Sequence, residues 1–401
     1  MKKPIKYRPY YFSKIEPFIN DSLIKVLVGQ RRVGKSYILK QLSQEILSRF
    51  PEAKILFINK EKYEFDFIKD YKDLISYIQE KSNSQVKTYL FIDEVQEIEQ
   101  FELALRSLQS DGNFDIYCTG SNAKLLSGEL ATALAGRYVQ FHIHSLTYKE
   151  FLDFHELSAS NETLYDYIKY GGMPHLVNLR KDESVYYEYL KNIYDSIILR
   201  DVVARYNIRN VHFLQNLIEF LADNVGSIVS AKKISDYLKS QQISLMPQTV
   251  LDYLVYLESV FYIERVKRKE IGGKKIFEIG DKFYFEDLGM RHALIPFQQK
   301  DINKVLENLV FHHLRANGYK VFIGKMDDKE VDFIAEKQEK ITYIQVAYMI
   351  MDEKTHEREF GNLLKIPDNN PKYVISMDEF TETSYKGIFH WSIMKFLLEF
   401  E

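Results

Sequence analysis

Residues Gly29–Ser36 read Gly-Gln-Arg-Arg-Val-Gly-Lys-Ser, and this stretch decides the fold. Its two glycines, lysine and hydroxyl stand at the spacing of a phosphate-binding loop. The apolar run Ile24–Val28 before it predicts a buried strand, and Tyr37–Leu47 after it carries apolar residues at helix spacing. The alternative is a chance match, which the flanking strand and helix disfavour. A strand–loop–helix unit is therefore predicted, with backbone N–H groups and a helix N-terminus directed at phosphate oxygens.

Each residue type in the loop has a physical role. Gly29 and Gly34 allow the backbone to turn so that successive amides point inward. Lys35 is expected to reach the β- and γ-phosphates, and the Ser36 hydroxyl to ligate Mg²⁺. The residues predicted to contact the nucleotide are Gly29, Gln30, Arg31, Arg32, Val33, Gly34, Lys35, Ser36 and Tyr37.

A second apolar run, Tyr89–Ile92, ends in Asp93 and Glu94. Ligands of α/β sheets collect at the carboxyl ends of parallel strands. Asp93 is therefore predicted to hold Mg²⁺ beside Ser36, and Glu94 to polarise the attacking water. The alternative is an acidic strand end that caps the next helix.

Length and composition set limits on the rest. A chain of 401 residues is expected to hold two to four domains. The net charge of −3 excludes a globally basic nucleic-acid binder, and a single cysteine, Cys118, excludes a disulfide framework. No apolar run approaches the span of a bilayer, and the N-terminus lacks a signal-peptide core. A cytoplasmic protein with no membrane contact is the expectation.

The pattern of elements changes along the chain. Strands and helices alternate over the first 145 residues, which predicts a parallel sheet wrapped by helices. Helical spacing follows from Thr147 to Asn210, and Gly171–Pro174 interrupts it. Two helices, Ala231–Lys239 and Gln248–Val260, then precede a predicted hairpin of Tyr262–Val266 and Lys275–Ile279, which is the plan of a winged helix-turn-helix. The predicted strands of the parallel sheet are Ile24–Val28, Lys54–Asn59, Tyr89–Ile92, Ile116–Thr119 and Tyr138–Ile143, and the last segment is predicted to contain a helix at Glu307–Leu314 and strands at Lys320–Phe322, Val331–Ala335, Thr342–Ala347 and Tyr373–Ser376.

Several motifs together resemble prokaryotic AAA-type ATPases that carry an uncharacterised nuclease-like C-terminal domain. They are the loop itself, Leu90–Gln96, Thr119–Asn122, Leu134–Tyr138, Tyr170–Pro174 and Arg200–Val203. The resemblance implies an α/β protein with four parts and ATP with Mg²⁺ as cofactors. These parts are an AAA-type ATPase domain with a P-loop and parallel sheet (1–146), a helical lid (147–210), a winged-helix domain (211–300) and a small α/β restriction-endonuclease-like domain without a working site (301–401).

The resemblance also implies two further catalytic residues and one point of topology. Asn122 is similar to a polar sensor of the γ-phosphate, with a helix cap as the alternative. Arg137 is similar to an arginine that neutralises transition-state charge, supplied within the chain or by a neighbouring subunit. A surface arginine is the alternative for Arg137. The strand before Asn122 is expected between the loop strand and the Asp93 strand.

The hairpin offers basic residues on either side of its glycine turn. Non-specific contact with DNA phosphates is one interpretation, and a protein-docking or oligomerisation module is the other. Helix Gln248–Val260 contains no lysine or arginine and carries Asp252 and Glu258, so reading of base sequence is not expected. The basic residues of the hairpin are Arg265, Lys267, Arg268, Lys269, Lys274 and Lys275.

The last segment resembles the restriction-endonuclease fold but departs from its site. Glu307 and Asp332 occupy two of the expected carboxylate positions, while Gln345 and Ala347 stand where a carboxylate and a lysine belong. Lys354 is one candidate for a displaced lysine.

Three hypotheses follow from these patterns. The first is a Mg²⁺-dependent ATPase that drives a conformational change on a protein or DNA partner. The second is a nucleotide-gated binding switch with slow turnover, and the third is an ATP-gated nuclease. A homo-oligomer is an open option that depends on how Arg137 acts.

Overall fold

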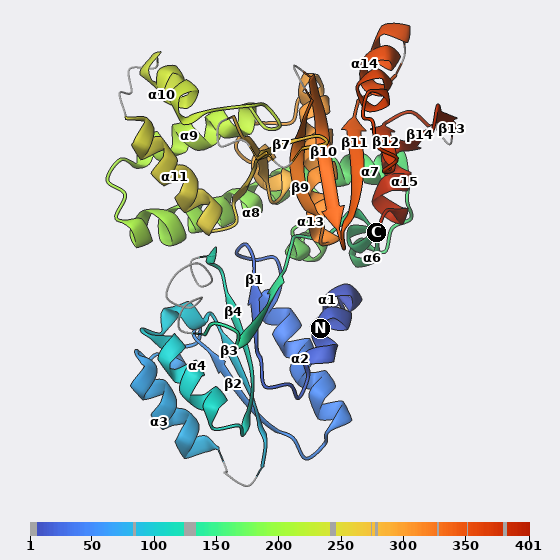
Figure 1. The fold of residues 1–401 in the computed structure, drawn as a ribbon. Coiled ribbons are helices and arrows are strands. Elements are labelled where there is room, and N and C mark those ends of the chain that lie inside the picture. Colours follow the sequence, from blue (N-terminus) through green and yellow to red (C-terminus); the bar gives the residue numbers. More distant parts are fainter. Residues whose placement is uncertain are drawn as a thin grey trace. The chain divides into compact units, whose positions relative to one another are not determined.

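The computed structural model describes residues 6–82, 86–123, 134–240, 246–273, 275–276, 280–326, 329–350, 352–379 and 383–401. The chain folds into two compact units (Figure 1). The first comprises Met1–His144 with Ser259–Phe261, and the second comprises Ser145–Glu258 with Tyr262–Glu401. The predicted boundaries of four domains remain predictions.

The first unit is built on a parallel sheet of five strands in the order β2-β3-β4-β1-β5. Its strands match the predicted ones to within a few residues, and β1 and β3, which are buried along their whole length, form largely apolar runs. β4 lies between β1 and β3, which confirms the order implied by the resemblance. The strands are β1 (Ile24–Val28), β2 (Lys54–Asn59), β3 (Thr88–Asp93), β4 (Phe114–Gly120) and β5 (Tyr138–His142).

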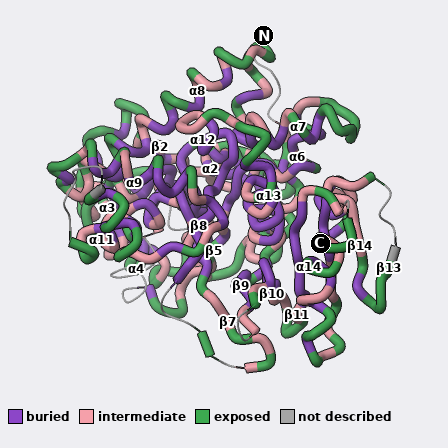
Figure 2. Tube along the Cα trace, turned by 90° about the horizontal axis from the view of Figure 1, so that it is seen from above, coloured by how far each residue is buried: buried purple, intermediate pink, exposed green. Residues whose placement is uncertain are grey.

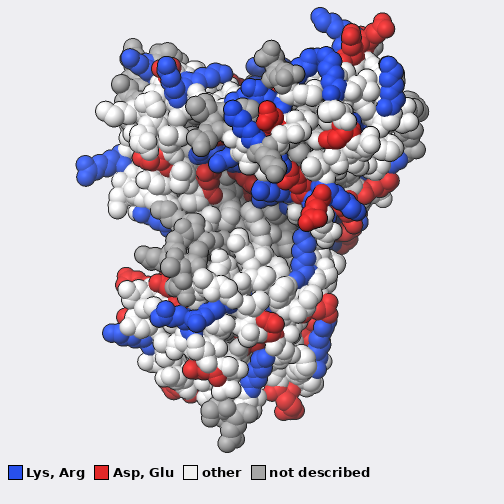
Figure 3. All heavy atoms as spheres, viewed as in Figure 1, with Lys and Arg blue, Asp and Glu red and all other residues white. Residues whose placement is uncertain are grey.

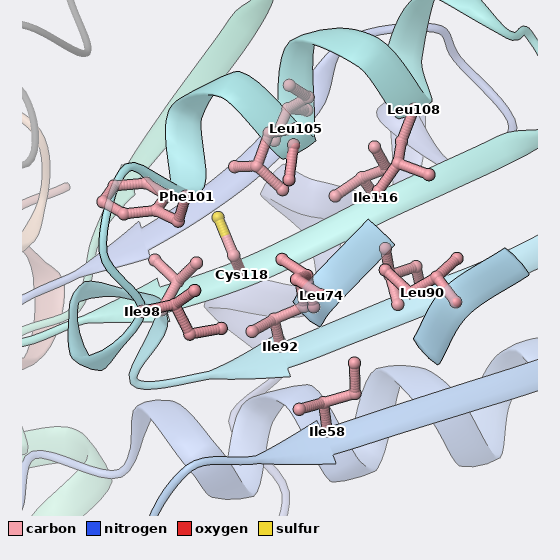
Figure 4. Close-up of a cluster of buried hydrophobic side chains, with 14 of the residues drawn as sticks. Ile58, Leu74, Leu90, Ile92, Ile98, Phe101, Leu105, Leu108, Ile116 and Cys118 are labelled. Atoms are coloured by element: carbon pink, nitrogen blue, oxygen red, sulfur yellow. The ribbon is translucent and has the colours of Figure 1, made fainter. Parts of the chain in front are cut away.

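Helices cover both faces of this sheet (Figure 1). α1 (Pro9–Ile15) and α2 (Lys35–Arg49) pack on one face, and α3 (Tyr71–Lys81) and α4 (Phe101–Ser110) on the other. Figure 4 shows the core under α4, where Leu105 lies over Cys118 and Leu108 over Ile116, both of β4. This packing fixes the carboxyl ends of β1, β3 and β4 along one edge.

The second unit begins with helices, as the sequence predicts. The chain between α7 and α8 is a 3₁₀ turn at Pro174–Asn178, and eight residues after α8, Ile197–Ala204, are π-helical. Among the described residues, no helix combines the length and apolarity needed to cross a bilayer. The α-helices before the hairpin are α6 (Tyr148–His155), α7 (Asn161–Tyr170), α8 (Glu183–Ser196), α9 (Val211–Asp223), α10 (Ala231–Ser240) and α11 (Pro247–Ser259).

The hairpin differs from its prediction. β6 (Ile263–Val266) pairs antiparallel with β8 (Lys282–Phe285), and Ile276 of the predicted strand Lys275–Ile279 forms an isolated antiparallel bridge with Lys269. Residues 277–279 of that predicted strand, and Lys274, lie outside the described residues. β7 (Arg268–Glu270) instead adds to the edge of the C-terminal sheet, parallel to β9. β6 and β7 thus pair with later segments of the chain, and local alternation does not specify which segment becomes the partner.

The C-terminal sheet has seven strands in the order β13-β14-β12-β11-β10-β9-β7. β9, β10 and β11 form an antiparallel meander, and β11 and β12 are parallel with α14 between them in sequence. Figure 2 shows buried positions along α13, whose apolar side chains include Leu306, Leu309 and Phe311. The remaining elements are α12 (Leu288–His292), α13 (Ile302–Ala316), β9 (Lys320–Met326), β10 (Lys329–Lys337), β11 (Lys340–Val346), α14 (Glu353–Leu364), β12 (Lys372–Ser376), β13 (Thr383–Tyr385), β14 (Ile388–Ser392) and α15 (Ile393–Glu399).

Candidate nucleotide-binding site

The loop between β1 and α2 has a backbone that requires glycine. Gly29 and Gly34 have φ values of 149° and 103°, in the region that side chains with a Cβ avoid. A Cβ on Gly29 would lie 2.1 Å from the carbonyl oxygen of Ile143. The loop thus passes close to the chain after β5, and only a glycine fits there.

The Lys35 side chain is buried and lies along this loop. Its Nζ donates hydrogen bonds to the carbonyl oxygens of Gly29 and Gln30, each at 2.9 Å. Carbonyl groups are weaker partners for an ammonium than phosphate oxygens are. The ammonium is therefore held at the loop and could transfer to a phosphate.

Asp93 joins the loop to the end of β3. Its Oδ1 accepts hydrogen bonds from the Ser36 hydroxyl at 2.9 Å and from the Thr119 hydroxyl at 2.7 Å. Burial raises the pKa of Asp93, and these two hydrogen bonds oppose that shift only in part. Its Oδ2 is buried and has no hydrogen-bond partner among the described residues. A carboxylate and a hydroxyl beside an unused carboxylate oxygen form a donor set that fits Mg²⁺.

Glu94 is held by residues of the neighbouring strand end. Its backbone N–H donates to the Thr119 hydroxyl at 2.9 Å, and its Oε2 accepts from Ser121 at 3.2 Å and from the Gln96 amide. Burial would raise the pKa of Glu94, but the charge of Lys35, the Gln96 hydrogen bond and the charge of Arg31 outweigh burial and lower it. The side chain is therefore an ionised carboxylate near the loop, the state that a general base requires.

Four residues of this arrangement were not singled out by the sequence. Thr119, Ser121 and Gln96 lie within the quoted motifs, and a polar residue at the end of a buried strand was the available signal for the first two. Arg8 is buried and donates to the carbonyl oxygens of Val33, at 3.1 Å, and His144, at 3.0 Å. Arg8 thus holds the loop by hydrogen bonds to residues far away in the sequence, and no local sequence pattern predicts such contacts.

The other loop side chains point in different directions. Gln30 is fully buried, and neither polar atom of its amide has a hydrogen-bond partner in the described part of the chain. Arg31 is buried with its Nη1 3.6 Å from Oε1 of Glu61, whereas Arg32 is exposed and has a positive φ of 71°. Val33 is buried, and Tyr37 is exposed on the first turn of α2.

The structure brings Asn122 near the site but not Arg137. Asn122 is buried just after the carboxyl end of β4, on the same edge as Asp93. Arg137 precedes β5, and its carbonyl oxygen accepts from the N–H of Ile24, at the amino end of β1. The loop follows the opposite end of that five-residue strand, about 13 Å or more away at 3.3 Å per residue.

Comparison with known proteins agrees with this geometry. A family model described as an AAA domain matches residues 21–152, and one described as a domain of unknown function matches residues 161–301. An uncharacterised protein of Haemophilus influenzae is 39% identical over the full length of both chains. The chain belongs to this family of AAA-domain proteins.

Two further relatives extend the comparison. An uncharacterised protein of Methanocaldococcus jannaschii is 32% identical over 91% of this chain and 85% of its own. The solved structure of a Walker-type ATPase of Pyrococcus abyssi aligns with a TM-score of 0.53, at 15% identity, over 72% of this chain and 95% of that chain. At that identity the likeness concerns the fold alone. The protein has the fold of an AAA-type P-loop ATPase, which is a fold for nucleotide binding and hydrolysis.

Proposed function

We propose that this protein binds ATP with Mg²⁺ and hydrolyses it. The observation that carries the proposal is the buried, unused Oδ2 of Asp93, whose other oxygen is bonded to Ser36 and Thr119. A buried carboxylate oxygen without a hydrogen-bond partner lowers the stability of the fold unless a bound ligand interacts with it. The choice of adenine rests on the family resemblance.

Each residue at the site has a proposed task. The backbone N–H groups of Gly29 to Tyr37 hold the phosphates, and Lys35 leaves the loop carbonyls for the β- and γ-phosphates. Ser36 and Asp93 would hold Mg²⁺, which neutralises phosphate charge when bound. Glu94 orients the attacking water and accepts its proton, and Asn122 senses the γ-phosphate.

Arg137 is proposed to act on a neighbouring copy of the chain. Its position at the amino edge of the first unit's sheet supports this choice, because it is separated from its own loop by the length of β1. Arg137 and Arg106 line a hollow of about 630 Å³ at this edge, together with Ser107, Ser110 and Asp111. A homo-oligomer is part of this proposal.

The partner that ATP turnover acts on is proposed to be a protein. The Nε of Arg265 lies 2.6 Å from Oε1 of Glu258, and Lys269 is paired with Glu336, so two of the hairpin's basic groups already have carboxylate partners. On the face shown in Figure 3, basic and acidic side chains are interspersed. Non-specific binding to a DNA backbone requires a continuous basic surface. Contact with DNA is therefore the second candidate, after a protein partner.

The C-terminal segment is proposed to have a restriction-endonuclease-like fold that serves as a binding module. The order of its elements supports this: α13, the antiparallel strands β9 to β11, α14, and β12 parallel to β11. The order of α9, α10, α11 and the β6–β8 pair similarly supports a winged helix. Function depends on the site within a fold, so neither assignment implies an activity.

The first test is steady-state phosphate release from ATP with Mg²⁺. We expect clear turnover in the wild type and a loss of about 10²- to 10⁴-fold in Glu94→Gln, with ATP binding retained. Glu97→Gln is the matched control, because Glu97 is an exposed glutamate three residues along the chain. ATP binding without turnover in the wild type would instead favour the nucleotide-gated switch.

A further inference from the structure

A lysine is buried among three carboxylates in the second unit. Lys282 lies on β8, and its side chain is 4% exposed. Its Nζ is 2.7 Å from Oε1 of Glu330, 3.1 Å from Oε2 of Glu307 and 3.8 Å from Oδ1 of Asp332. Two of these carboxylates, Glu307 and Asp332, are the ones that the sequence assigned to the metal of a nuclease.

The surroundings keep the lysine charged. Burial would lower the pKa of Lys282, but the acidic groups around it, the carboxylates of Glu307, Asp332 and Glu330 among them, outweigh burial and raise it. The Tyr284 hydroxyl also donates to Oε2 of Glu307 at 3.2 Å. An ammonium has three N–H donors and no acceptor, so it can serve the carboxylates of this cluster from a single position.

The remaining donors do not fit a metal centre. Oδ2 of Asp332 accepts the backbone N–H of Val346 at 2.8 Å, and Oε1 of Gln345 accepts the backbone N–H of Asp332 at 3.4 Å. Ala347 offers only a methyl group, and Lys354 is exposed on the first turn of α14. A nuclease metal needs free carboxylate oxygens at this point, and here both oxygens of Asp332 and Oε2 of Glu307 face an ammonium or a backbone amide.

We propose that Lys282 is the resident cation of this cluster and takes the place that a divalent metal occupies in an active nuclease. The comparison with a nuclease rests on the fold proposed for the C-terminal segment, whereas the cluster itself rests on the distances above. The lysine comes from β8 and the carboxylates from α13 and β10, so the cluster ties the hairpin to the C-terminal sheet. The centre is a structural ionic link and performs no metal-dependent cleavage.

This inference is tested by Mn²⁺ binding to the full chain without nucleotide, followed by the electron paramagnetic resonance signal of free Mn²⁺. We expect the wild type and Asp332→Asn to bind the same amount. Lys282→Met keeps the length of the side chain and removes its charge, so it should gain about one equivalent of Mn²⁺, the ion that the carboxylates can ligate once the ammonium is gone. Lys282→Met combined with Asp332→Asn should lose that gain.

The matched control is Lys269→Met. Lys269 is also paired with a glutamate, Glu336, but within the described part of the chain no second carboxylate forms an ion pair with its ammonium, and the variant should gain no Mn²⁺. An equal gain in Lys269→Met, or no gain in Lys282→Met, would overturn the inference. So would Mn²⁺ binding to the wild type that disappears in Asp332→Asn, and this comparison decides the matter even when Lys282→Met does not fold. None of these results depends on ATP hydrolysis.

Discussion

At the scale of single residues, the electrostatics of the loop bear on how Glu94 works. Arg31 and Arg32 are adjacent, but only Arg31 is buried and lowers the pKa of Glu94. Arg31→Met should therefore raise that pKa. Since Glu94 must be ionised to act as a base, activity should then be lost at a higher pH as the solution is acidified. The pH profile of phosphate release at saturating ATP measures the shift.

The control for this prediction is Arg32→Met. It removes the same charge one position away, from an exposed side chain, and its acidic limb should overlay that of the wild type. Superimposed profiles for Arg31→Met and the wild type would show that Arg31 does not act on the ionisation of Glu94.

Residue types and spacing were enough to predict the parts of the site that are local in sequence. The loop from Gly29 to Ser36 and the pair Asp93–Glu94 each follow a strand whose apolar run is unmistakable. Arg8 and Lys282 were not predicted, because both act on groups that are far away in the chain. A lone arginine or lysine carries no periodic signal, and only the folded arrangement shows what it contacts.

At the scale of elements, β1 contains a charge where its neighbours are apolar. Lys25 and Asp115 of β4 are fully buried and paired, and Asp115 also accepts the N–H of Asn20 at 2.8 Å and the Tyr117 hydroxyl at 3.0 Å. Lys25→Met would leave a buried carboxylate without its counter-ion. We therefore expect the free energy of opening of β1 and β4 to fall by about 3–5 kcal/mol. Adding Asp115→Asn should recover part of it.

Hydrogen exchange of peptides from β1 and β4 is the suitable measurement, because the only tryptophan, Trp391, lies in the second unit. A loss of stability below about 1 kcal/mol in Lys25→Met would mean that the Lys25–Asp115 pair is no stronger than an exposed ion pair. That result would refute the stabilising role assigned to the buried pair. A double variant no more stable than Lys25→Met would refute the role assigned to Asp115.

Prediction at the scale of elements succeeded for the strands of the parallel sheet and missed the partner of β6. β1 and β3 are buried along their whole length and largely apolar, so their positions can be recognised from the sequence. The segment Lys275–Ile279 alternates as a strand should, yet β6 pairs with β8, whose Phe283 and Phe285 are buried. Alternation shows that a segment can form a strand, and the choice of partner depends on contacts between distant parts of the chain.

At the scale of the whole molecule, the kinds of sheet that the chain forms could be predicted from the sequence better than the pairing of the individual strands. The parallel sheet and the position of β4 between β1 and β3 are confirmed, whereas β7, β13 and β14 extend a C-terminal sheet for which only four strands were predicted. β7 and β13 are the edge strands of this sheet and have three residues each, so they leave a weak pattern in the sequence. The position of Arg137 at the amino edge of its sheet could likewise be recognised only once β5 was seen to pair with β1.

That position leads to a prediction about assembly. An arginine supplied by a neighbouring copy makes turnover depend on protein concentration, so specific activity should fall on dilution. Arg137→Ala should reduce turnover by on the order of 10³-fold while ATP affinity is kept. Arg106→Ala, the other arginine of the same hollow, is the matched control and should remain active.

Mixing two inactive variants makes the test decisive. Arg137→Ala has an intact loop and Lys35→Ala has an intact arginine, so a mixed assembly contains interfaces with both groups. Phosphate release from the mixture should therefore exceed that of either variant alone at the same total concentration. If specific activity is independent of concentration and Arg137→Ala matches the wild type, Arg137 is a surface residue. Hydrolysis would then be completed by Lys35, Ser36, Asp93 and Glu94 within a single chain.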